Sequence, residues 1–284
     1  MTLRTVSTLE EAGRFGDATR LARQRLALVP TMGFLHEGHL SLMREARRHA
    51  DVVAVSIFVN PTQFGPNEDL ARYPRDAEGD LVKCASAGVD LVFLPEVAAL
   101  YGPGHQTWVD VVEVSQGLCG ERRPGHFRGV ATVVTKLLTL FRPHVALFGE
   151  KDYQQLQVIK ALARDLNLGA EVLGVPTLRD ADGLAMSSRN SYLSSEERTR
   201  ALSLSRGMEA ARALQAQGEL RAEPLVAVVR ATLAQAQVRE DYVALVDSES
   251  LRPLTVLSSG VPGRLLVAAF VGKTRLIDNM AIGG

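Results

Sequence analysis

Two histidines stand three residues apart in the segment Met32–Leu40, which follows a short apolar run and precedes an amphipathic stretch. Residues at this spacing share a face of helical backbone, so His36 and His39 can act on one ligand. Glycines 33 and 38 let the backbone approach a bulky anion, and the first N–H groups of a helix favour phosphate. We therefore predict a phosphate site. Two alternatives stay open: a structural histidine beside a surface histidine, or a metal pair, which lacks a nearby third ligand.

Three further segments carry cations that suit phosphate oxygens. Segment Ala185–Asn190 combines two hydroxyls with Arg189, whose guanidinium is always charged and binds oxyanions at two points. Lys151 follows an expected strand end, and Arg122–Gly129 is a basic loop that contains glycine. Each has an ordinary alternative: a solvated turn, a surface lysine paired with a neighbouring acid, and a solvated loop.

Neutral amides form a second group of candidates. Asn60 and Gln63 lie in the segment Val59–Gly65, at an expected strand end, and amides there can bind a hydroxy acid without adding charge. The alternative is a capped turn, because Asn-Pro favours turns by itself. Gln155 lies one helical turn after Lys151, on the same face.

The elements that position these residues alternate between apolar runs and amphipathic stretches, which predicts βαβ units and a parallel sheet. We expect a doubly wound, Rossmann-like α/β sheet, in which ligands bind beyond the carboxyl ends of the strands. The expected strands are 26–29, 52–59, 90–94, 108–114, 144–148 and 171–175. The expected helices are 39–50, 75–87, 129–141 and 153–166.

The pattern changes after Pro176, where two long helical stretches and several short strands predict a smaller α+β domain. The helices are expected at 194–217 and 223–237, and the strands at 242–246, 254–257, 265–271 and 275–278. We therefore predict a catalytic domain over residues 1–177 and a smaller C-terminal domain over residues 178–284.

Composition excludes several classes of protein. The 32 basic residues equal the 32 acidic residues, and each of the two expected domains is balanced to within one charge, which argues against nucleic-acid binding. Cys84 and Cys119 lack the spacing of a metal or disulfide framework, so they are expected to be small buried hydrophobes. Residues 1–24 show no signal peptide, and the chain has no apolar run long enough for a membrane span, so we expect a cytoplasmic protein.

The histidine motif and the later Met-Ser-x-Arg loop resemble the HIGH/KMSKS-type nucleotidyltransferases. A fuller set of segments is similar to the pantoate–β-alanine ligase family, in the family's own order between residues 30 and 193. These segments are PTMGFLHEGHLSL, SIFVNPTQFGPNEDLARYPR, PGHFRGV, FGEKDYQQL and VPTLRDADGLAMSSRNSYL.

This resemblance implies an enzyme that joins pantoate to β-alanine with ATP and Mg²⁺ and releases AMP and pyrophosphate. In the implied reaction the pantoate carboxylate attacks the α-phosphate of ATP, and the amine of β-alanine then displaces AMP from pantoyl adenylate. Because a reactive adenylate needs protection from water, either the smaller domain or the loop 64–75 is expected to act as a lid. A homodimer is implied as well, with no nucleic-acid or membrane partner. The resemblance identifies no protein ligand for Mg²⁺, which is expected to be held largely by ATP oxygens.

The resemblance also assigns roles to individual positions. His39 matches a proton donor and His36 its phosphate-binding partner, and both are implied to be catalytic together with Lys151 and Arg189. Pantoate and β-alanine are assigned to Gln63, Gln155, Asn60 and Arg123. The implied ATP site comprises Met32, Gly33, Phe34, Leu35, His36, Glu37, Gly38, His39, Gly149, Glu150, Lys151, Asp152, Leu178, Met186, Ser187, Ser188 and Arg189. Leu178 departs mildly from the family, where valine is common.

Three alternatives to this function remain at this point. Another HIGH-type adenylyl or cytidylyl transferase would share the histidine motif, but the paired glutamines argue against it. A fragment of a class I aminoacyl-tRNA synthetase would need a basic tRNA surface. A non-catalytic ATP-binding module is disfavoured by the intact histidines and cations.

Overall fold

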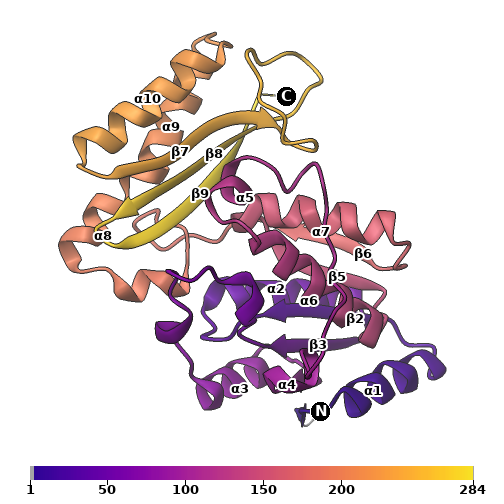
Figure 1. Ribbon diagram of the computed structural model, residues 1–284. Helices are drawn as coiled ribbons and strands as arrows, with labels where there is room; N and C mark the ends of the chain where they lie inside the picture. Colours follow the sequence, from indigo (N-terminus) through magenta and orange to yellow (C-terminus); the bar gives the residue numbers. More distant parts are fainter. Residues whose placement is uncertain (1–2, 284) are drawn as a thin grey trace. The chain divides into compact units, whose positions relative to one another are not determined.

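The structure, a computed structural model, describes residues 3–283 (Figure 1). The chain divides into two compact units, each described here by itself. The first unit extends to Glu150 and also contains Gln155–Pro176, and the second contains Lys151–Gln154 and the chain from Thr177 onward. The outermost residues of the two expected domains lie outside the described range.

The first unit contains a six-stranded sheet in which every neighbouring pair is parallel, in the order β1-β4-β3-β2-β5-β6. Its strands are β1 (Arg4–Val6), β2 (Leu26–Thr31), β3 (Val52–Ile57), β4 (Leu91–Phe93), β5 (Val145–Gly149) and β6 (Glu171–Val175). The central strands are buried on both faces, which is why they form near-continuous apolar runs in the sequence.

Helices cover both faces of this sheet. Residues of β2 alternate between two cores: Leu26 and Leu28 pack with helices α1, α6 and α7, and Ala27 and Val29 pack with α2 and α3. The helices of this unit are α1 (Leu9–Leu21), α2 (Glu37–His49), α3 (Ala77–Ser86), α4 (Val97–Leu100), α5 (Leu118–Arg122), α6 (His126–Phe141) and α7 (Tyr153–Asp165), of which α7 begins in Lys151–Gln154 of the second unit. The short 3₁₀ helices are η1 (Pro61–Gln63), η2 (Leu70–Arg72) and η3 (Glu150–Asp152).

The second unit is built on a three-stranded antiparallel sheet, β7-β8-β9. Its strands are β7 (Arg239–Asp247), β8 (Gly263–Val271) and β9 (Thr274–Ile282), and its helices are η4 (Ser188–Tyr192), α8 (Ser195–Ala201), α9 (Ser203–Ala216) and α10 (Ala222–Gln235). Helices α9 and α10 lie together along one face of this sheet and share its core (Figure 1).

The predicted fold class is confirmed, a doubly wound parallel sheet followed by a smaller α+β unit. Both cysteines are buried, as expected for small hydrophobic side chains. Within residues 3–283, no helix is long and apolar enough to cross a membrane.

The expected strand over residues 108–114 is wrong. This segment pairs with no strand; instead the Val109 N–H donates to the Thr132 hydroxyl of α6 at 3.1 Å, and Val109 and Val111 pack on the core beneath it. Because every second side chain of this extended segment packs against α6, its apolar residues alternate with exposed ones as they would in a strand. The edge strand β1 was not predicted, because only Val6 of its three residues is buried.

Two expectations in the second unit are also wrong. The segment 254–257 is not a strand: it lies in a loop with isolated bridges at Pro253 and Val256, and proline cannot donate to a ladder. The long helix expected over residues 194–217 is two helices, α8 and α9, which meet at Leu202.

Candidate active site

The candidate residues of the first unit follow three neighbouring strands, β3, β2 and β5. The chain winds from β2 through β3 to β4 on one side of the sheet, and then from β5 to β6 on the other. The reversal lies between β2 and β5, where α/β sheets bind their ligands beyond the strand ends. Segment Met32–His39 follows β2, Asn60–Gln63 follows β3, and Gln155 comes after β5.

The turn after β2 has a strained backbone that one buried carboxylate holds. Gly33 and Phe34 both have left-handed backbone, with φ of 81° and 50°. Asp80 on α3 is only 1% exposed and accepts hydrogen bonds from the N–H groups of Phe34 at 2.8 Å and Leu35 at 2.7 Å. A Cβ at position 33 would lie 2.9 Å from Ile57 Cγ2 and 3.0 Å from Asp80 Oδ2. The turn therefore requires glycine at position 33 and an acceptor at position 80.

Asp80 was missed at the sequence level, although a signal for it exists. It stands four residues before Cys84, and these two are the buried residues of α3. A carboxylate on the apolar face of a helix needs buried partners, because an unpaired buried charge is very costly. That pattern alone predicts that Asp80 has hydrogen-bond or ion-pair partners, but it does not identify which segment supplies them.

The two histidines form a reciprocal cap at the start of helix α2, in which each ring accepts a hydrogen bond from a backbone N–H group. The Gly38 N–H donates to His36 Nδ1 at 3.2 Å, and the His36 N–H donates to His39 Nδ1 at 3.3 Å. The ring centroids are 4.2 Å apart. Because both Nδ1 atoms accept hydrogen bonds, the neutral rings carry their protons on Nε2. The helix start therefore carries two Nε2–H groups, and both rings are half-buried, which differs from the alternative of one structural and one surface histidine. The phosphate role of the motif stays a prediction.

Asn60 and Gln63 form a fixed amide pair after β3. Asn60 is 1% exposed, and its NH₂ group donates to Gln63 Oε1 at 3.0 Å and to the Gly129 carbonyl at 3.1 Å. Its Oδ1 accepts from the N–H and hydroxyl of Thr62. The Gln63 NH₂ group consequently faces Met32, whose sulfur lies 3.3 Å away and is a weak acceptor.

Arg123 lies behind Gln63 in a dense ion-pair network. Its Nε and Nη2 donate to the two oxygens of Glu68 at 2.6 Å each, and Nη2 also donates to the Gln63 carbonyl at 3.2 Å. His126 Nδ1 donates to the same carbonyl at 2.8 Å, while Arg123 Nη1 donates to His126 Nε2 at 2.9 Å. In the predicted basic loop, Arg123 and His126 therefore use their hydrogen-bonding groups for contacts within the protein.

The charges of this network shift both pKa values. Burial by itself raises the pKa of Glu68, but the hydrogen bonds and charge of Arg123 outweigh it, so the pKa lies below its ordinary value. Burial likewise opposes the charge of Arg123, but Glu68 leaves the Arg123 pKa raised. Both groups are therefore charged at neutral pH.

Gly129 sets how closely α6 approaches the amide pair. A Cβ at this position would collide with the Thr62 carbonyl oxygen and would lie 2.6 Å from Thr62 C and 2.7 Å from Gln63 N. All of these are backbone atoms, so the segment would have to move. No role was predicted for Gly129, although it lies within the PGHFRGV motif.

Gln155 and the segment before it divide between the two units. Gln155 belongs to the first unit and is half-buried, whereas Lys151 and Asp152 group with the second. Lys151 Nζ lies 3.8 Å from Asp152 Oδ2, which matches the alternative of a lysine beside a neighbouring acid. A partly exposed pair at this distance contributes little and leaves the ammonium free to exchange partners.

The cationic loop of the second unit follows a short hairpin. Arg179 and Ala185 form an antiparallel bridge, and the Met186 N–H donates to the Leu178 carbonyl at 3.0 Å. The loop then leads into η4, where the Ser187 hydroxyl accepts from the Arg189 N–H at 3.3 Å. Leu178 is 38% exposed, an apolar side chain at the start of the hairpin.

Two buried polar atoms flank this hairpin, and neither has a hydrogen-bond partner within the described chain. They are Thr177 Oγ1 and Asn190 Oδ1. Buried polar atoms are nearly always paired, with protein, water or ligand. Their position beside Leu178 and Arg189 marks the hairpin as a place that a polar ligand can complete.

Comparisons with known proteins agree on one family. The family model described as Pantoate-beta-alanine ligase matches residues 2–281. A relative from Myxococcus xanthus named pantothenate synthetase is 71% identical over 92% of this chain and 89% of its own. Another, from Anaeromyxobacter dehalogenans, is 61% identical over 92% of each chain.

Solved structures agree as well. A pantothenate synthetase from Thermus thermophilus is similar with a TM-score of 0.93 and 46% identity, over 99% of this chain and 100% of that one. A pantoate-beta-alanine ligase from Francisella tularensis, solved with beta-gamma ATP and beta-alanine, is similar with a TM-score of 0.81 and 33% identity, over 98% and 97%. These findings confirm the resemblance seen in the sequence.

We expect Asp80→Asn to destabilise the protein by about 2–3 kcal/mol, because an amide group would face a backbone N–H in place of a charged acceptor. Urea unfolding at pH 7 measures this. Asp76→Asn is the matched control on the same helix, since asparagine caps a helix as well as aspartate. Equal stability of the two variants would contradict the role of Asp80 in holding the turn after β2.

We expect the stabilisation by the Glu68–Arg123 pair to depend on pH. Glu68 has a depressed pKa, so its contribution is full above its ordinary pKa of about 4.5 and is lost as the pH falls through the lower folded value. Urea titrations should find Glu68→Gln less stable than wild type by about 1–3 kcal/mol at pH 7, with a smaller gap at pH 3. Glu10→Gln, in an exposed pair with Arg14, is the control. If the difference in unfolding free energy between wild type and Glu68→Gln does not depend on pH, the stabilising role of the ionised Glu68 carboxylate is refuted.

Proposed function

The chain belongs to the pantoate-beta-alanine ligase family, and from this premise we infer that it catalyses the ATP-dependent condensation of pantoate with β-alanine. We propose that the reaction proceeds through a pantoyl adenylate. The observation that carries this proposal is the histidine pair, which offers two Nε2–H donors at the start of α2, beside the winding reversal of the sheet.

The chemistry requires activation, because a carboxylate is a poor acyl donor. In the first step an oxygen of the pantoate carboxylate forms a bond to the α-phosphorus of ATP, and the bond to pyrophosphate breaks. In the second step the neutral amine of β-alanine attacks the acyl carbon, AMP leaves with the electron pair of the C–O bond, and the nitrogen loses a proton. The products are pantothenate, AMP and pyrophosphate.

The histidines support the first step by hydrogen bonding. With both Nδ1 atoms held by backbone N–H groups, the rings of His36 and His39, and with them the Nε2–H groups, have a fixed orientation. Donors that are already oriented stabilise charge as it builds on the phosphates, without reorganisation during the reaction. We assign His39 as the main donor to the departing pyrophosphate and His36 as its phosphate-binding partner.

The amides of the first unit suit pantoate. Gln63 has its oxygen fixed by Asn60, so its NH₂ group is the part that can donate to a substrate carboxylate or hydroxyl. A neutral donor holds the carboxylate without the strong charge pairing that would weaken it as a nucleophile. We propose Gln155 as the second pantoate donor, and assign Asn60 and Arg123 to substrate binding through Gln63, since both contact it directly.

The second unit supplies cations for ATP. We propose that Lys151 and Arg189 bind phosphate oxygens, with Ser187 and Ser188 as hydroxyl donors. Segments Met32–Leu35 and Gly149–Asp152, together with Leu178 and Met186, complete the nucleotide contacts, with Leu178 against the adenine. The support is the loop chemistry and the two unpartnered atoms, Thr177 Oγ1 and Asn190 Oδ1.

We propose that Mg²⁺ accompanies ATP and is held mainly by phosphate oxygens. Among residues 3–283, no three His, Cys, Asp or Glu side chains gather as a metal cage. Magnesium ordinarily keeps several waters and binds through substrate phosphates, so it does not need one.

We also propose a cytoplasmic homodimer, for which family membership is the support. Light scattering at several protein concentrations tests the dimer. The lid role of the smaller unit or of the loop 64–75 stays a prediction. In the present structure that loop is anchored by the Glu68–Arg123 pair, and the edge-to-face contact of Phe64 with Tyr73 joins its two ends.

A pyrophosphate-release assay tests the proposed function. Release should require both ATP and pantoate, and a first turnover of pyrophosphate should appear without β-alanine, while AMP release should require all three substrates. Pyrophosphate that appears only when β-alanine is present would argue against a separate adenylate step. Release without pantoate would indicate a different nucleotidyl transfer.

We expect His39→Gln to lower the rate of pyrophosphate release about 10²–10³-fold, since it removes one oriented donor from the transition state. The thermal midpoint should change little. His49→Gln, at the exposed end of the same helix, is the matched control and should keep wild-type turnover. Near-normal turnover of His39→Gln would contradict the phosphate role.

We expect Gly129→Ala to raise the KM for pantoate about tenfold or more and to leave the KM for ATP nearly unchanged. The added methyl must displace the backbone at Thr62 and Gln63, and a misplacement near 1 Å can cost about 10²-fold in rate. Gly13→Ala is the control, because its Cβ would only touch Leu140 at 3.5 Å. An unchanged pantoate KM would show that Gln63 does not hold pantoate.

A further inference from the structure

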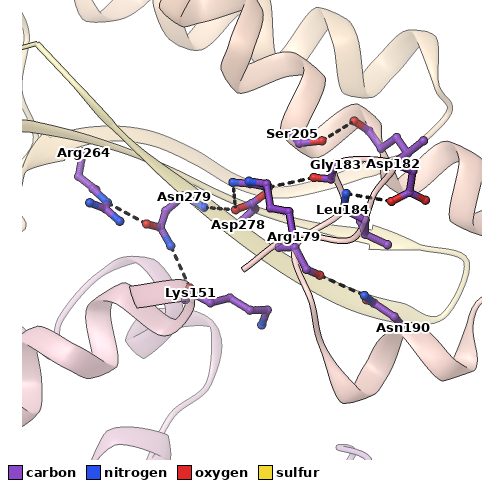
Figure 2. A network of polar contacts seen from close by, with 12 residues as sticks. Lys151, Arg179, Asp182, Gly183, Leu184, Asn190, Ser205, Arg264, Asp278 and Asn279 are labelled. Atoms are coloured by element: carbon purple, nitrogen blue, oxygen red, sulfur yellow. Dashed lines mark hydrogen bonds and ion pairs between the residues drawn. The ribbon is translucent and has the colours of Figure 1, made fainter. Parts of the chain in front are cut away.

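Two consecutive polar residues lie buried in β9, the last strand of the second unit. Asp278 and Asn279 are each 3% exposed. Side chains of successive strand residues point to opposite faces of a sheet, so the two reach different neighbours. Both sets of neighbours belong to the second unit (Figure 2).

Asn279 holds the backbone that carries Lys151. Its NH₂ group donates to the Lys151 carbonyl at 2.9 Å, and its Oδ1 accepts from Arg264 Nε at 2.8 Å. The Arg264 guanidinium in turn lies 4.0 Å from the centroid of the Tyr153 ring. Figure 2 shows the Lys151 side chain extending away from this contact, with its ammonium group at the far end. The carboxamide thus fixes the main chain of Lys151 and leaves its charge available.

Asp278 holds the hairpin that leads to Arg189. Its two oxygens accept from Arg179 Nη1 at 2.6 Å and Nη2 at 3.0 Å, and Nη1 also donates to the Gly183 carbonyl at 3.1 Å. Arg179 therefore ties the start of the hairpin to its turn, and Asp278 fixes the Arg179 guanidinium to β9.

Other contacts support the same hairpin from its remaining sides. Arg198 pairs with Asp180 at 2.7 Å and with Asp182 at 2.9 Å. The Asn190 NH₂ group donates to the Ala185 carbonyl at 3.0 Å.

A core strand does not need these groups in order to fold. The neighbouring strand residues Leu276 and Ile282 are apolar and buried, and an apolar pair costs less than a buried carboxylate and carboxamide that must both be satisfied. The polar pair instead contacts the two segments that carry the cations proposed to bind ATP. Adjacent positions on one rigid strand fix these segments relative to each other.

We propose that Asp278 and Asn279 are positioning residues of the ligation: they hold Lys151 and the Met186–Arg189 loop in one fixed arrangement that binds the ATP phosphates. This inference rests on the proposed phosphate role of Lys151 and Arg189. It predicts effects on ATP and none on pantoate binding, because both contacts lie within the second unit.

The test compares Asn279→Ala, Asn279→Asp and a control by steady-state kinetics on the full chain. Both Asn279 variants lose the donor to the Lys151 carbonyl, whereas Asn279→Asp keeps an acceptor for Arg264. We expect each to raise the KM for ATP about tenfold with an unchanged KM for pantoate. Asp241→Asn is the matched control, since it weakens another largely buried ion pair of the same sheet, with Arg275, and should leave both KM values at the wild-type level.

A double-mutant cycle separates this inference from the proposed function. If Asn279 acts through Lys151, Asn279→Ala combined with Lys151→Ala should be no worse than Lys151→Ala alone. Fully additive losses would overturn the inference. A Lys151→Ala variant with wild-type ATP kinetics would instead refute the proposed phosphate role, whatever the Asn279 variants do.

The variant Asp278→Asn tests the second half of the inference independently. It should also raise the KM for ATP and should couple to Arg189→Ala in the same way. A loss of thermal stability in Asp278→Asn with ATP and pantoate KM values both unchanged would make Asp278 purely structural and overturn its part of the inference. An Asn279→Asp variant with wild-type KM for ATP would assign the effect to Arg264 and overturn the part that concerns Lys151.

Discussion

Parallel strands of one sheet all end at the same edge, and open α/β sheets bind their ligands there in the crevice where the winding of the chain reverses. In this protein the reversal lies between β2 and β5. The turn after β2 must pass directly into helix α2, which requires left-handed backbone at Gly33 and Phe34. The histidines take their orientation from that helix start, so the geometry of the two donors that we propose for phosphate depends on this turn.

Buried and half-buried polar residues, none of them proposed to touch substrate, hold the candidate site in place. Asp80 binds the backbone of the turn, Asn60 orients Gln63, and the Glu68–Arg123 pair holds the Gln63 carbonyl from behind. A buried charge or amide is costly unless all its partners are present, so each of these groups permits few alternative arrangements. Such contacts contribute orientation more than net stability.

The second unit uses the same principle with different elements. Its sheet places Asp278 and Asn279 side by side in β9, and their partners are Arg179 and the main chain of Lys151. The neutral composition of the whole chain is compatible with this arrangement. Many acids pair with arginines, as in the contacts of Arg198, while Lys151 and Arg189 lie on segments held through their backbone.

The sequence by itself determined the fold class, the five ordered motifs and the residue types of the site. These follow from local patterns: apolar runs that must be buried, glycines where the backbone turns, and donors next to strand ends. It failed at residues 108–114, where packing on α6 produces the alternation of a strand, and at 194–217, where one helical pattern is two helices. Only the tertiary structure identified the roles of Asp80, Gly129, Asp278 and Asn279. It alone also showed that the Arg123 guanidinium forms an ion pair with Glu68. The physical reason is distance along the chain: each of these residues contacts a segment 45 to 128 positions away, which local spacing does not encode.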